Sequence, residues 1–259
     1  MKKLSKALAV AAVAGASAAY MPVASAVPTG LELVLLVDVS GSVDATEYDL
    51  QKTGYIDAFK SAAVQDAIVN SVGGSIAVSY VEWSGNAQQS VLVNFMLIDS
   101  AASSIAFADA IAATSRAFSG QTAIQSAMAF GGGLFASNGF EAGRQVIDVS
   151  GDGADNDSAC VFNGDGADCG KAAALAAGVD TINGLPILGE TGLLAYYDAN
   201  VKGGTGGFVT PAANFADFSR AIESKLIKEI VGVPEPISLA LFGVSLAGLG
   251  LARRRRMPV

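Results

Sequence analysis

Histidine is absent from the 259 residues of this chain, and its absence excludes several kinds of site. A Ser-His-Asp triad needs a histidine as the base that activates the serine. Many zinc sites need at least one imidazole ligand. The sequence therefore argues against a triad hydrolase and against any zinc site that uses histidine.

Basic residues are also scarce: sixteen lysines and arginines stand against twenty-four aspartates and glutamates, and the net charge is −8. Seven of the sixteen lie at the two ends of the chain, at Lys2, Lys3, Lys6 and Arg253–Arg256, which leaves nine between them. So acidic a middle would repel the phosphates of nucleic acid and of anionic lipid. It is compatible with cation binding and with solubility.

The first residues have the pattern of a secretory signal peptide. A basic start, Met1–Lys6, precedes a small and apolar run, Ala7–Tyr20, and Ala24-Ser25-Ala26 supplies small residues for cleavage. We therefore expect signal peptidase to remove residues 1–26. The alternative is a membrane anchor, which the weakly hydrophobic, alanine-rich run disfavours.

The last residues, 232–259, contain three parts in a characteristic order. Pro234-Glu235-Pro236 is followed by sixteen mostly apolar residues, Ile237–Ala252, and then by Arg253–Arg256. Sixteen is below the roughly 20 residues of a full transmembrane helix, although flanking arginines reach the interface. This order resembles the PEP-CTERM sorting signal. The resemblance implies processing by an exosortase in a Gram-negative bacterium, a transient inner-membrane anchor, and a final place in the periplasm, outer surface or extracellular matrix. The alternative is a plain C-terminal anchor.

Cysteine occurs twice, at Cys160 and Cys169, in a loop rich in glycine and aspartate. In an exported protein this spacing predicts one disulfide, and the alternative of two free thiols is disfavoured by an oxidising compartment. The aspartates of this loop could form a second cation site. Their spacing does not fit an EF-hand, so a solvated acidic loop is favoured. They are Asp155, Asp157, Asp165 and Asp168.

Between the two ends, residues 27–231 are long enough for one α/β domain with a sizeable core. Leu33–Val37 are all apolar, which is typical of a strand buried on both faces of a parallel sheet. A short link predicts that Ser90–Leu97 pairs antiparallel with the preceding strand, at an edge. Helices between the strands should cover both faces of this mostly parallel sheet. The expected strands are 31–39, 75–81, 90–97, 145–149, 181–187 and 207–209, and the expected helices are 44–61, 103–114, 123–136, 170–177, 193–200 and 214–231.

Three of these helices carry further signals. Asp44 with Glu47 three positions later predicts an N-terminal cap for the first helix. Gly131-Gly132-Gly133 inside a helix predicts close packing on the sheet. The last helix has one apolar face, formed by Phe215, Phe218, Ile222, Leu226 and Ile230.

Oxygen-bearing side chains gather where the first buried strand ends. Asp38, Ser40 and Ser42 occupy alternate positions after that strand, at the sheet edge where α/β folds bind ligands. Hard oxygen donors suit Mg²⁺, Mn²⁺ or Ca²⁺ and not Zn²⁺. The ordinary alternative is that Asp38 or Ser42 caps the helix that begins near Asp44.

The group Asp38-Val39-Ser40-Gly41-Ser42 on that strand end resembles the first element of the metal site of von Willebrand factor type A (vWA) domains, and the segments Tyr80–Gly85 and Thr181–Ile187 resemble an uncharacterised bacterial subgroup of that family. The resemblance implies a Rossmann-like fold and a metal-ion-dependent adhesion site (MIDAS), to which Thr122 and Asp152 also contribute. The chain departs from the family pattern at Gly151, where a threonine is usual, and at Asp148, which lies inside an expected buried strand. Asp152-Gly153 could also be an ordinary turn.

The family's site would use the hydroxyls of Ser40, Ser42 and Thr122 as direct ligands, with Asp38 and Asp152 binding directly or through water. One position on the cation, Mg²⁺ foremost, would stay open for an acidic group of a protein or polysaccharide partner. The alternatives are a structural matrix protein without a specific ligand and, more remotely, a metal-dependent hydrolase with Ser40 as nucleophile. For that nucleophile the sequence offers no evident base. We therefore expect a binding protein and not an enzyme.

Overall fold

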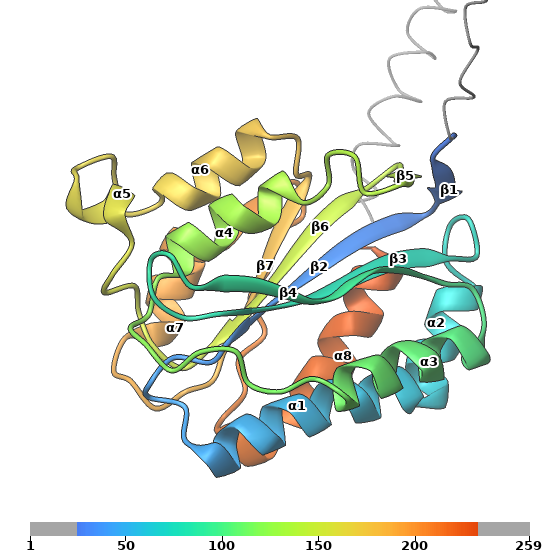
Figure 1. The fold of residues 1–259 in the computed structure, drawn as a ribbon, viewed down its shortest axis with the longest axis horizontal. Coiled ribbons are helices and arrows are strands. Elements are labelled where there is room, and N and C mark those ends of the chain that lie inside the picture. The colour runs from blue at the N-terminus through green and yellow to red at the C-terminus, as the bar shows by residue number, and fades with distance from the viewer. Residues whose placement is uncertain (1–24, 233–259) are drawn as a thin grey trace, which may run out of the picture.

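The computed structural model describes residues 25–232 (Figure 1). The sorting tail and all but the last two residues of the expected signal peptide lie outside the described residues. Within residues 25–232, no helix combines the length and the apolar character needed to cross a membrane. The expected apolar segment Ile237–Ala252 lies beyond this range.

One six-stranded sheet forms the centre of the fold, in the order β4-β3-β2-β6-β7-β8. Parallel pairing joins β3, β2, β6 and β7, whereas β4 and the very short β8 are antiparallel to their neighbours. The expected fold class, a mostly parallel sheet with an antiparallel edge, is confirmed. The strands are β2 (Leu31–Asp38), β3 (Ile76–Trp83), β4 (Gln89–Ile98), β6 (Gln145–Gly151), β7 (Thr181–Pro186) and β8 (Gly203–Gly204), and a separate parallel pair is formed by β1 (Val27–Thr29) and β5 (Phe140–Ala142).

Helices cover both faces of the sheet (Figure 1). Successive side chains of β2 point to opposite faces, so this strand contributes to an apolar core on each side. Leu33 and Leu35 belong to one apolar core, under α1, α2, α3 and α8, and Val34 and Leu36 to a second core, under α4 and α6. The helices are α1 (Ala45–Lys60), α2 (Ala62–Val69), α3 (Ala101–Ala112), α4 (Ile124–Gly133), α5 (Ala159–Phe162), α6 (Cys169–Ala176), α7 (Leu193–Tyr196) and α8 (Phe218–Val231), with a π-helical turn at Tyr197–Val201 and a 3₁₀ turn at Phe215–Asp217.

Local signals explain several of these elements. Asp44 accepts a hydrogen bond from the Glu47 backbone N–H, and the Glu47 carboxylate accepts one from the Asp44 N–H, so the expected cap of α1 is a complete capping box. A Cβ on Gly131 would lie 3.1 Å from Leu36 Cδ1, and one on Gly132 would lie 2.8 Å from Ala174 Cα. These glycines therefore bring α4 close to the sheet and to α6. The apolar residues of α8 predicted from the sequence are buried, whereas Phe215 lies in the 3₁₀ turn before α8 and is partly buried.

Some elements differ from the prediction. Ser61 ends α1 but also begins α2, because its side chain accepts a hydrogen bond from the Val64 N–H, and this second helix was not predicted. The strand predicted at 207–209 is wrong: Val209 makes an isolated bridge to Gly184, and the ladder next to β7 is β8 instead. The predicted helix 193–200 becomes α7 and the π-helical turn.

The described chain enters and leaves at the same end of the sheet. Strand β1 precedes the first residue of β2, and a hollow of about 250 Å³ at this end is lined by Gly30, Val72 and Arg144 together with Val231. Asp38 lies at the other end of β2. The two chain ends of the described domain are thus opposite the carboxyl edge of the sheet.

Candidate metal site

Four of the five predicted metal ligands converge in the structure at the carboxyl edge of β2 and β6. Asp38 is the last residue of β2, and its Oδ1 accepts a hydrogen bond of 2.7 Å from the Ser40 N–H. The hydroxyls of Ser40 and Ser42 are 3.1 Å apart, and Ser42 Oγ donates to Asp152 Oδ1 at 2.7 Å. Asp152 reaches this place because β6 runs parallel to β2 and ends beside it.

Thr122, the fifth predicted ligand, lies beside this group. The Gly41 N–H donates to the Gly120 carbonyl at 2.7 Å, which joins the segment before α4 to the loop after β2. Thr122 Oγ1 lies 3.6 Å from the place that a Cβ on Gly153 would take. Its side chain therefore faces the turn that carries Asp152.

The alternative that Asp38 or Ser42 caps α1 does not hold, because Asp44 is itself the N-cap residue. Asp38 is instead buried, and its Oδ2 has no hydrogen-bond partner within residues 25–232. Burial raises the pKa of Asp38 from 3.8 to about 7; the Ser40 N–H opposes this rise, and the charge of Asp152 adds to it. Burial also raises the pKa of Asp152, against the effect of its bond from Ser42. The two carboxylates are thus buried close together, where desolvation and mutual repulsion disfavour their charged forms. A cation between them would offset this unfavourable energy.

The departure from the family pattern at Gly151 has a steric reason. A Cβ at this position would lie 2.6 Å from Asp38 Oδ2 and 2.9 Å from the Tyr197 hydroxyl. The Tyr197 hydroxyl is buried and, like Asp38 Oδ2, has no hydrogen-bond partner in the described part of the chain. Tyr197 therefore occupies space that the side chain of a threonine would need.

Arg116 fixes the loop after β2 and was not identified from the sequence. Its Nη2 donates to the carbonyls of Val39, Ser40 and Val43 at 2.8 to 2.9 Å. The only signal for it in the sequence is a lone arginine in a stretch poor in basic residues. Because one guanidinium holds three carbonyls, the backbone that carries Ser40 and Ser42 has a defined position.

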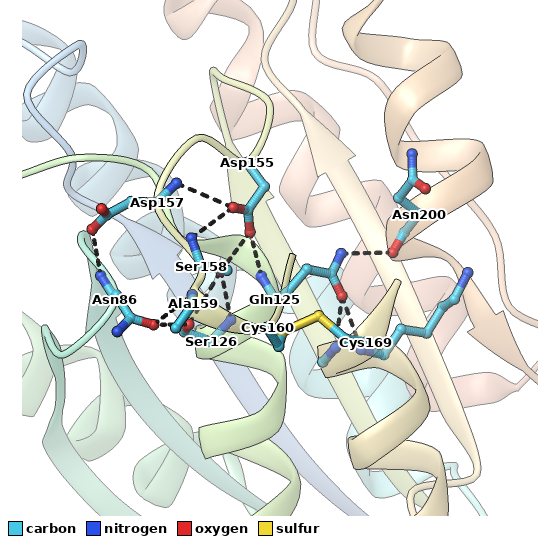
Figure 2. Close-up of a disulfide and its surroundings, with 12 residues drawn as sticks. Asn86, Gln125, Ser126, Asp155, Asp157, Ser158, Ala159, Cys160, Cys169 and Asn200 are labelled. Carbon is cyan, nitrogen blue, oxygen red and sulfur yellow. Dashed lines mark hydrogen bonds between the residues drawn. A yellow bond between two sulfur atoms is a disulfide. The ribbon is translucent and has the colours of Figure 1, made fainter. Parts of the chain in front are cut away.

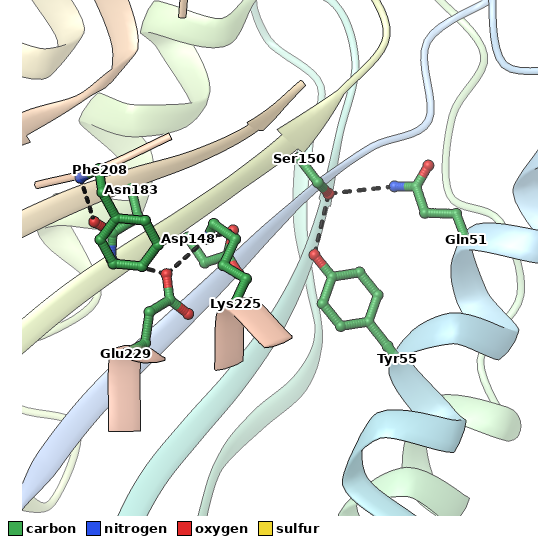
Figure 3. Close-up of polar contacts among 8 residues, drawn as sticks. All are labelled: Gln51, Tyr55, Asp148, Ser150, Asn183, Phe208, Lys225 and Glu229. Carbon is green, nitrogen blue, oxygen red and sulfur yellow. Dashed lines mark hydrogen bonds and ion pairs between the residues drawn. The ribbon is translucent and has the colours of Figure 1, made fainter. Parts of the chain in front are cut away.

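A polar group beneath the site supports the two strand ends. Gln51 Nε2 donates to the Asp38 carbonyl at 3.3 Å and to Ser150 Oγ at 3.4 Å, and the Tyr55 hydroxyl lies 3.1 Å from the same Ser150 oxygen (Figure 3). Both Gln51 and Tyr55 belong to α1 and are buried. Helix α1 is thereby tied to both strands that carry the site.

The donor set fits a hard divalent cation. The described residues include no group of three or more histidine, cysteine, aspartate or glutamate side chains that could hold a metal ion by themselves. The predicted set has two carboxylates and three hydroxyls, and so depends on hydroxyl and water oxygens. That chemistry suits Mg²⁺, Mn²⁺ or Ca²⁺. Metal binding by these five residues stays a prediction.

The acidic loop after the site is held by its own aspartates (Figure 2). Asp155 Oδ2 accepts from the Gln125 N–H at 2.8 Å and from Ser158 Oγ at 2.6 Å, and thus caps α4, whose own N-cap residue, Ala123, makes no side-chain cap. Asp157 Oδ2 accepts from the Asn86 N–H at 2.8 Å. These contacts give Asp155 and Asp157 structural roles in the loop.

A disulfide joins Cys160 in α5 to Cys169 in α6 in the structure (Figure 2). The exposed Asp165 and Asp168 lie in the loop that it closes, and Asp168 pairs with Lys171 at 3.3 Å. The bond connects the acidic loop to the helix that packs on α4.

Asp148 of β6 belongs to a buried group of charged side chains between the sheet and α8 (Figure 3). Lys225 Nζ lies 2.5 Å from Asp148 Oδ1 and 2.6 Å from Glu229 Oε1, and Asn183 Nδ2 donates to the same Glu229 oxygen at 2.8 Å. Burial and then the charge of Asp148 raise the pKa of Glu229 from 4.5 to about 8, against the effect of Lys225. A proton on Glu229 balances the two carboxylates against one ammonium.

A family model matches most of this chain. Residues 28–234 match the family model described as "Protein of unknown function (DUF1194)". The chain belongs to the DUF1194 family. Residues 232–256 of this DUF1194 protein match the PEP-CTERM protein-sorting motif, which confirms the resemblance of the tail.

Solved structures similar to this DUF1194 protein include a von Willebrand factor type A protein. The PilB minor pilin from Streptococcus sanguinis is 14% identical, with 83% of this chain and 65% of the pilin covered and a TM-score of 0.57. Proximal thread matrix protein 1 from the mussel byssus, with a zinc-occupied MIDAS motif, is 17% identical, with 81% and 47% covered and a TM-score of 0.52. A von Willebrand factor type A protein from Catenulispora acidiphila is 17% identical, with 78% and 43% covered and a TM-score of 0.51.

At these identities the likeness concerns the fold, and the vWA architecture expected from the sequence is confirmed. The DUF1194 chain spans about half the length of the mussel protein that it matches. No curated protein matches it. The division into residues 1–26, 27–231 and 232–259 stays a prediction.

Proposed function

We propose that this protein is an exported, surface-sorted vWA domain that binds a partner through a divalent cation. The observation that carries the proposal is the chain of contacts from Asp38 through Ser40 and Ser42 to Asp152 at the carboxyl edge of the sheet. With Thr122 beside it, this group would hold the cation. A bound cation would supply an electrophilic centre for an acidic group of the partner.

The solved relatives support a binding role. One is a pilus adhesin, SpaC from Lactobacillus rhamnosus GG, and another is a byssus matrix protein with zinc at its MIDAS motif. For this chain we propose Mg²⁺ first, with Mn²⁺ or Ca²⁺ as substitutes, and a partner that is a protein or an acidic polysaccharide. The domain is itself acidic, so binding to such a partner should depend steeply on the cation.

The PEP-CTERM motif indicates an exported surface protein. We propose that signal peptidase removes Met1–Ala26, that the tail anchors the chain briefly in the inner membrane of a Gram-negative bacterium, and that an exosortase then processes it. The protein would finally lie in the periplasm, on the outer surface or in the extracellular matrix. Nucleic acid is not an expected partner.

An enzymatic role has little support from the environment of Ser40. Lys52, a candidate base, donates instead to the carbonyls of Ala112 and Thr114, and Lys60 pairs with Asp109 at 2.7 Å. The Ser40 hydroxyl contacts the Ser42 hydroxyl, which cannot act as the general base for a serine nucleophile. We therefore favour binding over turnover. Hydrolysis of model esters or phosphates in a Ser40-dependent way would contradict this choice.

Calorimetric titration of the purified protein with Mg²⁺, Mn²⁺ and Ca²⁺ tests the site. We expect one cation per chain, loss of binding in Asp38→Ala with an unchanged circular dichroism spectrum, and weakened binding in Thr122→Ala. Asp49→Ala, which changes an exposed aspartate of α1, is the matched control and should bind normally. Equal titrations of Asp38→Ala and the unaltered protein would refute the assignment. EDTA should release captured partners if they are bound through the cation. Partners that stay bound in EDTA would instead indicate a passive matrix protein.

A further inference from the structure

A groove of about 440 Å³ adjoins the candidate metal site. It lies between the first turns of α1, the loop after β7 and the 3₁₀ turn before α8, and Asp152 forms part of its wall. A ligand bound at the site therefore has a continuous path into the groove.

The groove combines apolar surface with two further carboxylates. Leu50, Leu188 and Phe215 supply the apolar surface, and Leu50 is 40% exposed. Glu47 and Glu190 supply the charge, and among the described residues that line the groove none is basic. An apolar patch beside excess negative charge suits a ligand with an apolar and a cationic group.

Both glutamates have fixed positions. Glu190 Oε2 accepts from the Ala154 N–H at 2.9 Å, and Glu47 Oε2 accepts from the Asp44 N–H at 2.8 Å. Glu190 Oε2 and Thr122 Oγ1 each lie 3.6 Å from the Cβ position of Gly153. Since an extended chain advances about 3.3 Å per residue, the carboxylate of Glu190 is within a few residues' reach of a group bound at the site.

We infer that the groove receives a protein segment in which a lysine or arginine and an apolar side chain lie within three residues of the acidic residue that faces the cation. This inference rests on the proposed function and selects a protein over an acidic polysaccharide. A polymer with a carboxylate on every sugar would bring repeated negative charge against Glu47 and Glu190. It would also leave the apolar surface of Leu50 and Phe215 without a counterpart.

A peptide array tests the inference with the purified full chain. Each peptide carries one fixed aspartate, with the positions up to three residues on either side varied among lysine, glutamate, leucine and serine. Alginate, a carboxylated polysaccharide, is the competing probe. In Mg²⁺ we expect binding to be strongest where lysine and leucine flank the aspartate.

Two variants assign this preference to the groove. Glu190→Gln should weaken binding to lysine-containing peptides about threefold, as expected for one exposed ion pair, and leave serine-containing peptides unchanged. Leu50→Ser should remove the preference for leucine. Glu141→Gln, an exposed glutamate on β5 at the opposite end of the sheet, is the matched control.

The outcomes separate the two proposals. Normal cation titration without a lysine preference, or Mg²⁺-dependent alginate binding that Glu190→Gln does not alter, overturns the inference and leaves the cation role standing. Absence of cation binding overturns the proposed function. In that case a lysine preference that depends on Glu190 still supports the groove, and its absence refutes the groove as well.

Discussion

The replacement Lys225→Met removes the ammonium group that lies 2.5 Å from Asp148 and 2.6 Å from Glu229. Methionine nearly preserves the length of the side chain, so the main change is electrostatic. Both carboxylates are buried in the core, with exposed fractions of 0% and 2%. Removing one partner of a buried ion pair costs about 3–5 kcal/mol, and we expect a loss of unfolding free energy in this range near pH 8.

The loss should be smaller at pH 5. Glu229 has a pKa of about 8 in the folded protein against 4.5 ordinarily, so between these values the folded chain keeps a proton that the unfolded chain has released. Stability from this group is complete below about pH 4.5 and is lost as the pH rises through 8. Because the charge of Lys225 lowers the pKa of Glu229, removal of Lys225 makes the folded protein depend still more on the proton of Glu229.

Urea unfolding at pH 5 and pH 8, with EDTA in all samples, measures both effects. Lys228→Met is the matched control: Lys228 is exposed on the same helix, with its Nζ 3.6 Å from the Phe208 ring centroid, and its loss should cost about 1 kcal/mol or less. A deficit for Lys225→Met below about 1 kcal/mol, or equal deficits at the two pH values, would refute the reasoning.

Three further predictions concern other parts of the molecule. Gly151→Thr should lower the midpoint of thermal unfolding, because its Cβ would lie 2.9 Å from the Tyr197 hydroxyl; the loss should shrink in the background of Tyr197→Phe, and equal losses would contradict the steric account. Reduction of the Cys160–Cys169 disulfide should cost at most about 3 kcal/mol, because the closed loop is short, and mass analysis after non-reducing alkylation should find no free thiols. Intact mass of protein recovered from the cell surface should lack the residues from Ile237 onward; a mass that includes them would indicate a simple anchor.

Much of the fold was predictable because its signals are local. The apolar run of β2, the capping box of α1 and the apolar face of α8 each follow from a few neighbouring residues. The second helix after Ser61 was missed because one serine both ends and begins a helix there. Strand β8 was missed because it consists of Gly203 and Gly204, which carry no side-chain pattern.

At the candidate site, sequence motifs identified the ligands but not their supports. Asp38, Ser40 and Ser42 were evident because they are close together in the chain. Arg116 and Tyr197 act on the same loop and strand end from distant segments, and their side chains reach the site only through the fold. Lys225 likewise could not be assigned to Asp148 from the sequence, since 77 positions separate them.

The placement of both ends of the described domain, residues 25–232, opposite the candidate site has a mechanical consequence. Strand β2 runs the whole way between them, and its eight residues span roughly 26 Å. A tether attached at Gly232 would therefore present the site outward, at the full height of the domain above its attachment. Tension between that tether and a captured partner would act along the strands, so that the parallel ladder of β2 and β6 is loaded in shear, with its hydrogen bonds sharing the force.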